Sequence, residues 1–203
     1  MRTQQQIISD VLPGSPAAHA GLVIGDRLLS INGEAVVDLV DYEHLTASEQ
    51  LTLLIQKKSG GCEEISIEKD DYEPLGLSFA TSLMDKMRTC KNHCVFCFID
   101  QMPKGGRSSL HVKDDDWRMS FIMGNYVTLT NLDERELDRV IRRRVSPLYI
   151  SLHASDPVVR RAMMKNPHAG EIVPQLKRLA EADLQFHLQE QESLKDLQWN
   201  QYL

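Results

Sequence analysis

The chain has 203 residues, of which 42% are hydrophobic and 26% are charged, and its formal net charge is −6. This composition is typical of a globular protein that buries a core in one large or two small domains. The acidic balance argues against a nucleic-acid partner, and no apolar run reaches the roughly 18 residues that a membrane span requires. Because the opening MRTQQQIISD also lacks the apolar segment of a secretory signal, we expect a cytoplasmic protein.

The first segment has the turn-rich sequence LPGSPAAHAGL followed by IGDRLLSING. Residues 17–20 can form one helical turn that ends at Gly21, and residues 27–31 alternate as a short strand closed by Asn32-Gly33. Further along, LTLLIQKKSGGCEEISIEKD predicts two strands joined by a Gly-Gly turn. Together these signals predict a small β-rich domain.

The pattern G-S-P-A-x-x-A-G-L-x-x-G-D-x-L-x-x-I-N-G in this segment resembles the bacterial form of the PDZ domain. The resemblance implies a protein or peptide partner, because PDZ domains bind a peptide end or strand beside one sheet edge. The expected carboxylate-binding loop is missing ahead of the SPA turn, but a similar sequence, PLGLSF, occurs at residues 74–79. Either this later strand completes the PDZ-like sheet in a permuted order, or it only leads into the next domain.

From about residue 80 the pattern changes to alternating strands and helices. Strands are predicted in NYVTLTNL (125–132), PLYISLHA (147–154) and, as a beginning only, LQFHLQ (184–189). Helices are predicted in LDERELDRVIRRR (132–144), SDPVVRRAMM (155–164) and EIVPQLKRLAEAD (171–183). The basic run in the first of these helices is interpreted as a solvated face. Strands and helices in this order indicate parallel βα units.

Three of the four cysteines, Cys90, Cys94 and Cys97, lie within the eight residues CKNHCVFC in the spacing C-x3-C-x2-C. In a reducing compartment, clustered cysteines are more often metal ligands or catalytic residues than disulfides. Soft sulfur ligands select iron-sulfur clusters, zinc or cuprous copper. Zinc needs a fourth ligand, which His93 can supply, although its position next to Cys94 makes tetrahedral ligation by both awkward. Cys62 stands apart from the group, and we assign it no role.

This spacing, the aromatic Phe96 before the last cysteine and the βα units that follow resemble the radical S-adenosylmethionine (radical SAM) enzymes. The stretches CKNHCVFCFIDQMPKGGRSSLHVKDDDWRMSFIMGNYVTLTNL and SPLYISLHASDPVVRRAMMKNPHA are similar to one bacterial family. Members of that family have an N-terminal PDZ module, a radical SAM barrel and a C-terminal domain of unknown function.

The resemblance implies a [4Fe-4S] cluster on Cys90, Cys94 and Cys97, with one iron left open to bind SAM by its amino and carboxylate groups. It also implies an external electron donor and reductive cleavage of SAM to methionine and a 5′-deoxyadenosyl radical, which abstracts hydrogen from a substrate. The predicted cofactor-binding residues are Phe96 beside the cluster, Gly124 and Asn125 at the place of a Gly-rich motif, and His153 at the C-terminal edge of a strand.

The acidic run KDDDWR, residues 113–118, lies close to the cysteines in the sequence. One of its carboxylates could position a substrate. We favour a solvated loop in which an aspartate caps the following helix.

The predicted fold class is α/β, with a PDZ-like domain at residues 1–75 and a partial (β/α) radical SAM barrel at residues 76–187. The ending LQEQESLKDLQWNQYL predicts an aberrant or disordered tail at residues 188–203. Because the strands are too few for a six-strand barrel, we expect a truncated or frame-shifted fragment in which the cluster loop can form but turnover is doubtful. The function predicted by family resemblance is an iron-sulfur, SAM-dependent radical oxidoreductase of unknown substrate. The alternative is a non-catalytic PDZ-like peptide-binding protein with a structural zinc or iron-sulfur site.

Overall fold

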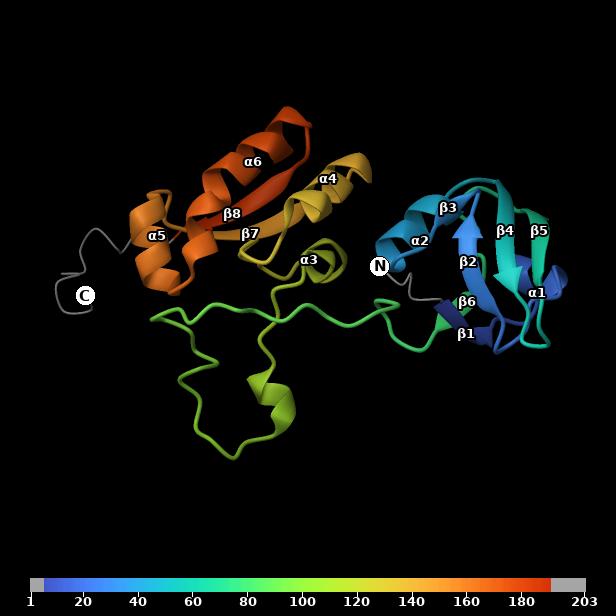
Figure 1. Cartoon of the computed structure of the whole chain (residues 1–203), viewed down its shortest axis with the longest axis horizontal. Coiled ribbons are helices and arrows are strands. Elements are labelled where there is room, and N and C mark those ends of the chain that lie inside the picture. The colour runs from blue at the N-terminus through green and yellow to red at the C-terminus, as the bar shows by residue number, and fades with distance from the viewer. Residues whose placement is uncertain (1–5, 191–203) are drawn as a thin grey trace. The chain divides into compact units, whose positions relative to one another are not determined.

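The structure is a computed structural model, and it describes residues 6–190. The chain divides into two compact units between Lys86 and Met87, and each unit is described here by itself (Figure 1). Among the described residues, no helix is both long enough and apolar enough to cross a bilayer. The predicted tail at 188–203 lies mostly outside the described residues, but residues 188–190 belong to a strand.

The first unit is built on an antiparallel sheet with the strand order β5-β4-β2-β1-β6, and β3 pairs with β2. These strands are β1 (Gln6–Val11), β2 (Arg27–Ile31), β3 (Glu34–Ala35), β4 (Gln50–Gln56), β5 (Cys62–Glu68) and β6 (Leu77–Phe79). In β4 the alternate residues Leu51, Leu53 and Ile55 are buried, as in a sheet that covers a core with one face. The strands predicted at residues 27–31 and on both sides of the Gly-Gly turn are confirmed.

Two short helices complete this unit, α1 (Pro16–His19) and α2 (Leu39–Thr46). Helix α1 begins at Pro16 because the Ser15 hydroxyl accepts the Ala18 N–H and proline suits the first helical position. Helix α2 begins after Asp38, whose carboxylate accepts the N–H groups of Val40 and Asp41. The predicted helical turn at residues 17–20 corresponds to α1.

Strand β6 decides between the two interpretations of PLGLSF. It pairs antiparallel with β1, Val11 lying opposite Leu77, and it forms one edge of the sheet. Gly76 makes this return possible because its φ is +84° and a Cβ there would lie 2.3 Å from the Ser15 hydroxyl. The strand therefore belongs to the first unit and completes its sheet from the C-terminal side.

The second unit contains a parallel pair of strands, β7 (Leu148–His153) and β8 (Phe186–Glu190). Val127 joins the other edge of β7 through a single parallel bridge to Ile150. The strand predicted at residues 125–132 is therefore shorter than expected. The physical reason is that Leu129 has a φ of +58° and the hydroxyls of the flanking threonines bond to side chains. The described residues do not form a closed barrel.

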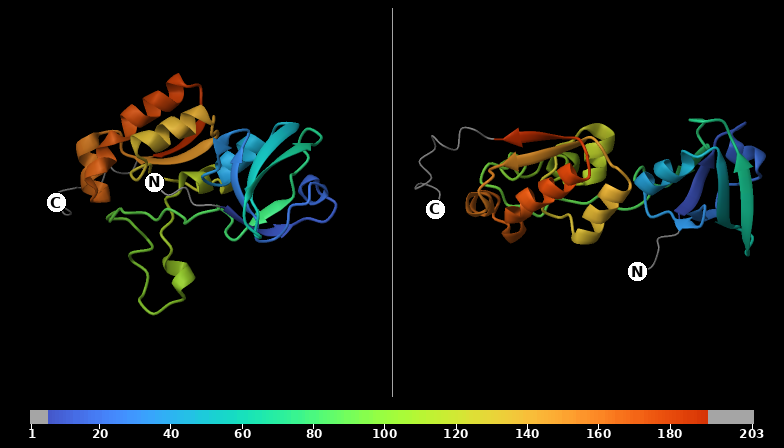
Figure 2. Two further views of the ribbon diagram at one scale, coloured as in Figure 1. Left: turned by 45° about the vertical axis from the view of Figure 1, so that its right-hand side comes forward. Right: turned by 90° about the horizontal axis from the view of Figure 1, so that it is seen from above.

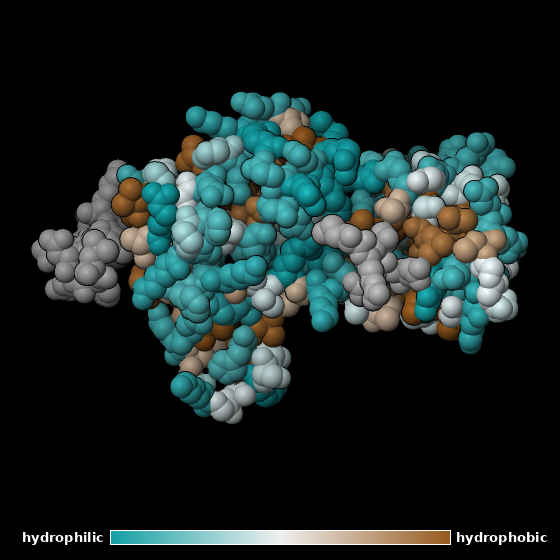
Figure 3. Space-filling view, viewed as in Figure 1, coloured by the Kyte–Doolittle hydropathy of each residue, from teal (hydrophilic) through white to brown (hydrophobic). Residues whose placement is uncertain are grey.

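The helices of this unit are α3 (Trp117–Met123), α4 (Glu134–Arg142), α5 (Pro157–Met164) and α6 (Ile172–Glu181), with 3-10 turns η1 (Ser108–His111) and η2 (Pro167–Glu171). Helices α4 and α6 lie on one face of the β7–β8 pair (Figure 2). Their outer surface is hydrophilic (Figure 3), and Arg178 of α6 pairs with Glu134 and Asp138 of α4. The three helices predicted between residues 132 and 183 are confirmed, including the Asp156 cap followed by Pro157 in α5.

Candidate functional site

The cysteine loop, residues 89–97, is held by backbone hydrogen bonds on two sides. At its start, Thr89 pairs with Asp114 and the Cys90 N–H donates to the Lys113 carbonyl at 2.8 Å. Further along, the loop lies beside the C-terminal end of α5 (Figure 1). There the N–H groups of residues 93 and 95 donate to the carbonyls of Met164 and Met163, at 3.0 and 2.9 Å. Two segments far away in the sequence therefore fix the shape of this loop.

The three cysteines of the loop are half-buried thiols, and no disulfide joins any cysteine of the chain. Burial raises the pKa of Cys94 to about 12, and the neighbouring Cys90 and Cys97 sulfurs add to the effect. Burial also raises the pKa of Cys90. Cys90 and Cys94, whose pKa values are raised, need a nearby cation to become thiolates together with the neighbouring Cys97, and a metal centre supplies that charge.

The side chain of Asn92 is buried inside the loop, with 1% of its surface exposed. Its amide nitrogen donates to Cys90 Sγ at 3.3 Å and to Thr128 Oγ1 at 3.0 Å. Its amide oxygen accepts from Thr130 Oγ1 at 3.0 Å and from Asn166 Nδ2 at 2.6 Å. The whole hydrogen-bonding capacity of this carboxamide is therefore used.

Lys113 contacts the cysteine loop through its ammonium group. Its ammonium group donates to the Asn92 carbonyl at 2.7 Å and to Asp100 Oδ2 at 2.8 Å. Burial works against the charge of Lys113, but the hydrogen bond to Asp100 and the nearby Cys97 sulfur raise its pKa. The loop therefore carries a fixed positive charge beside its sulfurs.

Arg160 of α5 is a buried guanidinium, with 1% of the residue exposed. It donates to four backbone carbonyls, those of Leu152 at 2.8 Å, Ala169 at 2.5 Å, Thr128 at 2.9 Å and Ser151 at 3.0 Å. These carbonyls lie in β7, in the segment after Val127 and in η2. One side chain thus ties together the C-terminal ends of neighbouring parallel segments.

Phe96 and His153, two predicted cofactor-binding residues, lie together. Their ring centroids are 4.7 Å apart, and Phe96 also packs against the buried Met163, Met164 and Ala169. His153 ends β7 with a φ of +60°, and its Nδ1 is buried with no hydrogen-bond partner. Burial and the nearby Arg160 lower the pKa of His153 to about 4, so its imidazole is neutral at pH 7. A strained backbone and an unused polar atom are typical of functional sites.

Gly124 and Asn125, the other two predicted cofactor-binding residues, lie between α3 and Val127. Gly124 caps the C-terminus of α3 in the left-handed conformation, with a φ of +74°. The side chain of exposed Asn125 donates to Asp114 Oδ2 at 2.7 Å. This pair lies next to the base of the cysteine loop, but its visible contacts are those of a helix cap and a turn.

The expectation of a solvated loop at KDDDWR is wrong for most of the run. Asp115, Asp116 and Arg118 are each at most 1% exposed, and Arg118 Nη2 donates to Asp116 Oδ2 at 2.6 Å. The N-cap prediction is right, because Asp116 accepts the Arg118 N–H at the start of α3. Burial of this run follows from the hydrogen bonds that Thr128 and Arg88 supply to its carboxylates.

Sequence reasoning missed Asn92, whose side chain holds the cysteine loop, and Arg160, whose side chain binds the strand ends. Asn92 lies inside the motif that was analysed for its cysteines alone. Arg160 lies in a helix where an arginine is ordinarily solvated. The signal for Arg160 was its place in α5, one turn before the two buried methionines Met163 and Met164.

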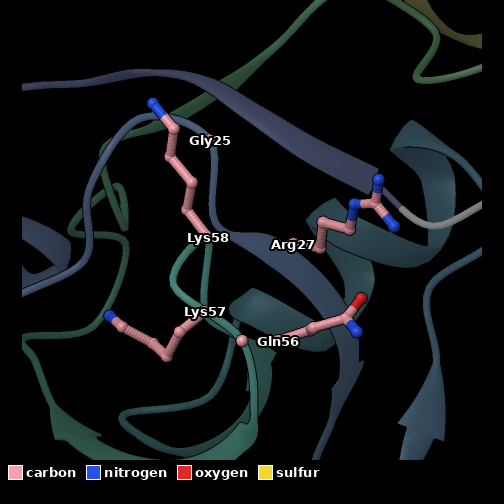
Figure 4. Close-up of a pocket in the computed structure, with 6 residues that line it drawn as sticks. Gly25, Arg27, Gln56, Lys57 and Lys58 are labelled. Carbon is pink, nitrogen blue, oxygen red and sulfur yellow. The ribbon is translucent and has the colours of Figure 1, made fainter.

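A separate surface hollow of about 290 Å³ lies in the first unit and is lined by Gly25, Arg27, Gln56, Lys57, Lys58 and Gly60. Figure 4 shows Lys57 and Lys58 extending to one side and Arg27 and Gln56 to the other. The Lys57 ammonium is already bound to Asp26 at 2.6 Å. The positive charges around this hollow therefore do not converge on one ligand position.

The fold and the cysteine loop define a class of protein. It is an α/β domain with a candidate inorganic site at the C-terminal ends of parallel segments, joined to a small antiparallel β domain. Comparison with known families agrees: a radical SAM-like domain matches residues 69–191, and a PDZ domain matches residues 7–57. Since the first match covers more than half of the 203 residues, the chain belongs to the radical SAM-like domain family.

The donor set of the loop fits an iron-sulfur cluster. Among residues 6–190, no three His, Cys, Asp or Glu side chains converge on a point where one metal ion would bind. A cluster does not require such convergence, because each cysteine ligates a different iron. The two N–H groups of Asn92 that reach Cys90 Sγ, from the backbone at 3.5 Å and from the side chain at 3.3 Å, are also the kind of contact that clusters use.

Proposed function

We propose that the chain is an iron-sulfur, SAM-dependent radical enzyme in which Cys90, Cys94 and Cys97 each ligate one iron of a [4Fe-4S] cluster. The observation that carries the proposal is the group of three unpaired, half-buried thiols on one loop beside the C-terminal ends of parallel segments. When bound, the cluster supplies an electron for the reductive cleavage of SAM, and the fourth iron provides its binding position. Family membership supports this chemistry.

The residues around the loop have separate roles in this proposal. Phe96 and the methionines at the end of α5 exclude water from one side of the cysteines. We assign His153 to the SAM pocket, because its neutral ring lies against Phe96 and its Nδ1 has no partner within residues 6–190. The predicted contact of Gly124 and Asn125 with SAM stays a prediction. The substrate is unassigned. A cytoplasmic location is part of the proposal, because unpaired thiols and a cluster persist in a reducing compartment.

The test of cluster binding is oxygen-free reconstitution with iron and sulfide, followed by absorption spectroscopy and counting of iron, sulfide and zinc. We expect thiolate-to-iron absorption in the visible range and about four irons per chain, one per corner of a [4Fe-4S] cluster. Cys90→Ala, Cys94→Ala and Cys97→Ala should each lose most of this iron. Cys62→Ala is the matched control, because Cys62 is an exposed thiol on β5 of the first unit. A colourless protein that holds one zinc would instead support the non-catalytic binding protein.

A second assay separates a catalyst from a protein that uses its cluster only as a structural brace. The reconstituted chain is incubated with dithionite and SAM, and 5′-deoxyadenosine is measured by liquid chromatography. We expect product with the native chain, and none when reductant is omitted. A fully loaded cluster that yields no 5′-deoxyadenosine would contradict the enzymatic part of the proposal and leave the cluster part standing.

We further propose that the first unit recruits a protein partner by binding a peptide at the β6 edge. PDZ domains bind peptides beside a sheet edge, and β6 is an edge strand of this sheet. Helix α2 lies next to this strand, because the rings of Phe79 in β6 and Tyr42 in α2 meet edge to face with their centroids 5.2 Å apart. Fluorescence anisotropy with labelled peptides that end in an apolar residue tests this. Amidation of the C-terminal carboxylate should weaken binding about 10-fold, a loss of about 1.4 kcal/mol. Equal binding of both forms would contradict carboxylate recognition.

A further inference from the structure

The orientation of the Asn92 carboxamide follows from its neighbours. Asn166 Oδ1 accepts the backbone N–H of His168 at 2.9 Å, so Asn166 presents its Nδ2 to Asn92. A donor must meet an acceptor, and the Asn92 atom at that contact is therefore its oxygen. The Asn92 nitrogen then faces Cys90 Sγ, and exchanging the two atoms would set two N–H groups against each other.

A buried carboxylate lies at the far end of the same hydrogen-bond chain. Asp115 Oδ1 accepts the Thr128 N–H at 2.6 Å, and Asp115 Oδ2 accepts the Thr128 hydroxyl at 2.7 Å. The Thr128 hydroxyl oxygen in turn accepts from Asn92 Nδ2 at 3.0 Å. The carboxylate thus fixes the direction of the Thr128 hydroxyl, which fixes the nitrogen end of Asn92.

We propose that Asn92 is a positioning residue that orients Cys90 and raises the reduction potential of the cluster through an N–H···S hydrogen bond. This inference rests on the proposed function. It assigns a role to a residue between the cysteines, where neither the cysteine spacing nor the family match names one. Asn92 acts through Cys90, a proposed ligand of the cluster, whose sulfur it contacts.

The electrostatic reason for a raised reduction potential is that reduction adds one electron to the cluster. A reduced cluster carries more negative charge on its sulfurs than an oxidised one, and an N–H dipole directed at a sulfur stabilises that charge. Hydrogen bonds to sulfur are one of the means by which proteins set cluster potentials. Because Asn92 is 1% exposed, bulk water does not compete with its N–H group for the sulfur in the native chain.

The loop is also held in place by this side chain. Its partners Thr128, Thr130 and Asn166 lie 36, 38 and 74 residues away in the sequence. These bonds connect the cysteine loop to the segment after Val127 and to the residue before η2. Losing them should therefore loosen the Cys90 ligand as well as change the potential.

The test compares the reconstituted full chain with Asn92→Ala, Asn92→Asp and the control Asn131→Ala. Asn131 is a suitable control because its amide also bonds within this region, to the Asp115 carbonyl at 3.1 Å. Two quantities are measured without turnover: the midpoint potential from a redox titration followed by electron paramagnetic resonance, and the rate of iron loss to a chelator. Far-ultraviolet circular dichroism verifies that each variant is folded.

We expect a more negative midpoint potential in Asn92→Ala, and iron loss about 10-fold faster. Asn92→Ala keeps the backbone N–H at Cys90 Sγ, so the change reports on the side chain alone. Asn92→Asp keeps the size of the side chain, guards against a misfolded alanine variant, and should shift the potential further because an oxygen then faces the sulfur. Asn131→Ala should match the native chain in both measurements.

Two failures are distinguishable. If the native chain assembles its cluster and folded Asn92 variants have the native potential and iron-loss rate, the role of Asn92 is refuted while the proposed function stands. If the native chain itself takes up no iron, the proposed function is refuted and the role of Asn92 with it.

Discussion

The two units of this protein use buried polar groups in different ways. In the first unit most of them act on neighbouring residues: Asp38 caps α2 through N–H groups two and three positions away, and Ser15 caps α1, while Asp26 is the exception that reaches Lys57, 31 residues away. In the second unit they act over long sequence distances, as Arg160 does with Thr128, 32 residues away. The first unit is a continuous apolar core with local caps, whereas the second has a polar network that connects its loop to its strands.

The two kinds of interaction contribute differently to the stability of a fold and to the exact placement of single atoms. Apolar burial is roughly proportional to area and non-directional, so it stabilises a fold without fixing single atoms. Hydrogen bonds are directional, and a buried donor or acceptor left without a partner costs free energy. A site that must hold three sulfurs in one arrangement therefore benefits from the second kind of interaction. The following predictions test or sharpen this comparison.

The largest effect is expected for Arg160→Met, which removes the guanidinium donor from four backbone carbonyls, of which that of Leu152 keeps the Ala154 N–H at 2.7 Å. Each unsatisfied acceptor costs about 1–3 kcal/mol, with partial relief by water, so we expect a loss of about 3–5 kcal/mol in the second unit. Hydrogen exchange measured by mass spectrometry should show lost protection in β7 and no change in β4. Arg161→Met is the matched control, since Arg161 is the exposed neighbour on the same helix, and its effect should stay within about 0.5 kcal/mol. Equal effects of the two variants would contradict the central role of Arg160.

The counterpart in the first unit is Leu53→Ala. Leu53 is fully buried in β4, an interior strand of the sheet, and its truncation leaves a cavity in the apolar core. We expect a loss of about 3 kcal/mol, within the usual range for leucine. Urea denaturation followed by the same exchange measurement should place this loss in residues 6–86. A loss of protection that spreads to β7 would mean that the two units unfold together.

A smaller effect is expected for Asp38→Ala, because it removes the side-chain cap of the short helix α2. The expected destabilisation is about 1–2 kcal/mol, confined to the first unit and measurable by thermal unfolding. Asp38→Asn should recover most of it, since an asparagine oxygen can accept the same N–H groups. If the asparagine variant is as unstable as the alanine variant, then the charge of Asp38, and not its capping geometry, stabilises the first unit.

The last effect is a pH dependence that differs between the units. His153 has an ordinary pKa of 6.5 lowered to about 4, so the unfolded chain takes up its proton first as the pH falls. Its contribution to stability is complete above pH 6.5 and is lost between pH 6.5 and 4. Although burial opposes it, the hydrogen bond from Lys57 lowers the pKa of Asp26, so the Asp26 contribution in the first unit is lost only below about pH 3.8.

The variant His153→Asn isolates this effect, because asparagine tolerates the positive φ at this position. The stability difference between the native chain and the variant should change between pH 6.5 and 4 in the second unit. Asp115 also titrates in this region, since burial raises its pKa to about 6, but it is present in both proteins and cancels in the difference. A pH-independent difference would show that His153 does not titrate as described.

Much of the fold could be predicted because its signals are local. The Asp156-Pro157 pair marked the start of α5, and the apolar run at residues 148–153 marked β7. The edge strand β6 could not be assigned from its own sequence, because only pairing with β1 distinguishes it from a connector. The acidic run at residues 113–118 was expected in solvent for a similar reason, since its partners Arg88 and Thr128 lie elsewhere in the chain.

The sequence by itself determined which atoms are available for the chemistry: the three cysteines, their spacing and the βα units that follow them. It also determined the caps and turns, since these depend on residues only a few positions apart. The tertiary structure alone decided that Asn92 faces a sulfur, that Arg160 is buried and that His153 lies against Phe96. The physical reason is that hydrogen bonds and ring contacts act over a few ångströms, and chain segments distant in sequence come that close only after folding.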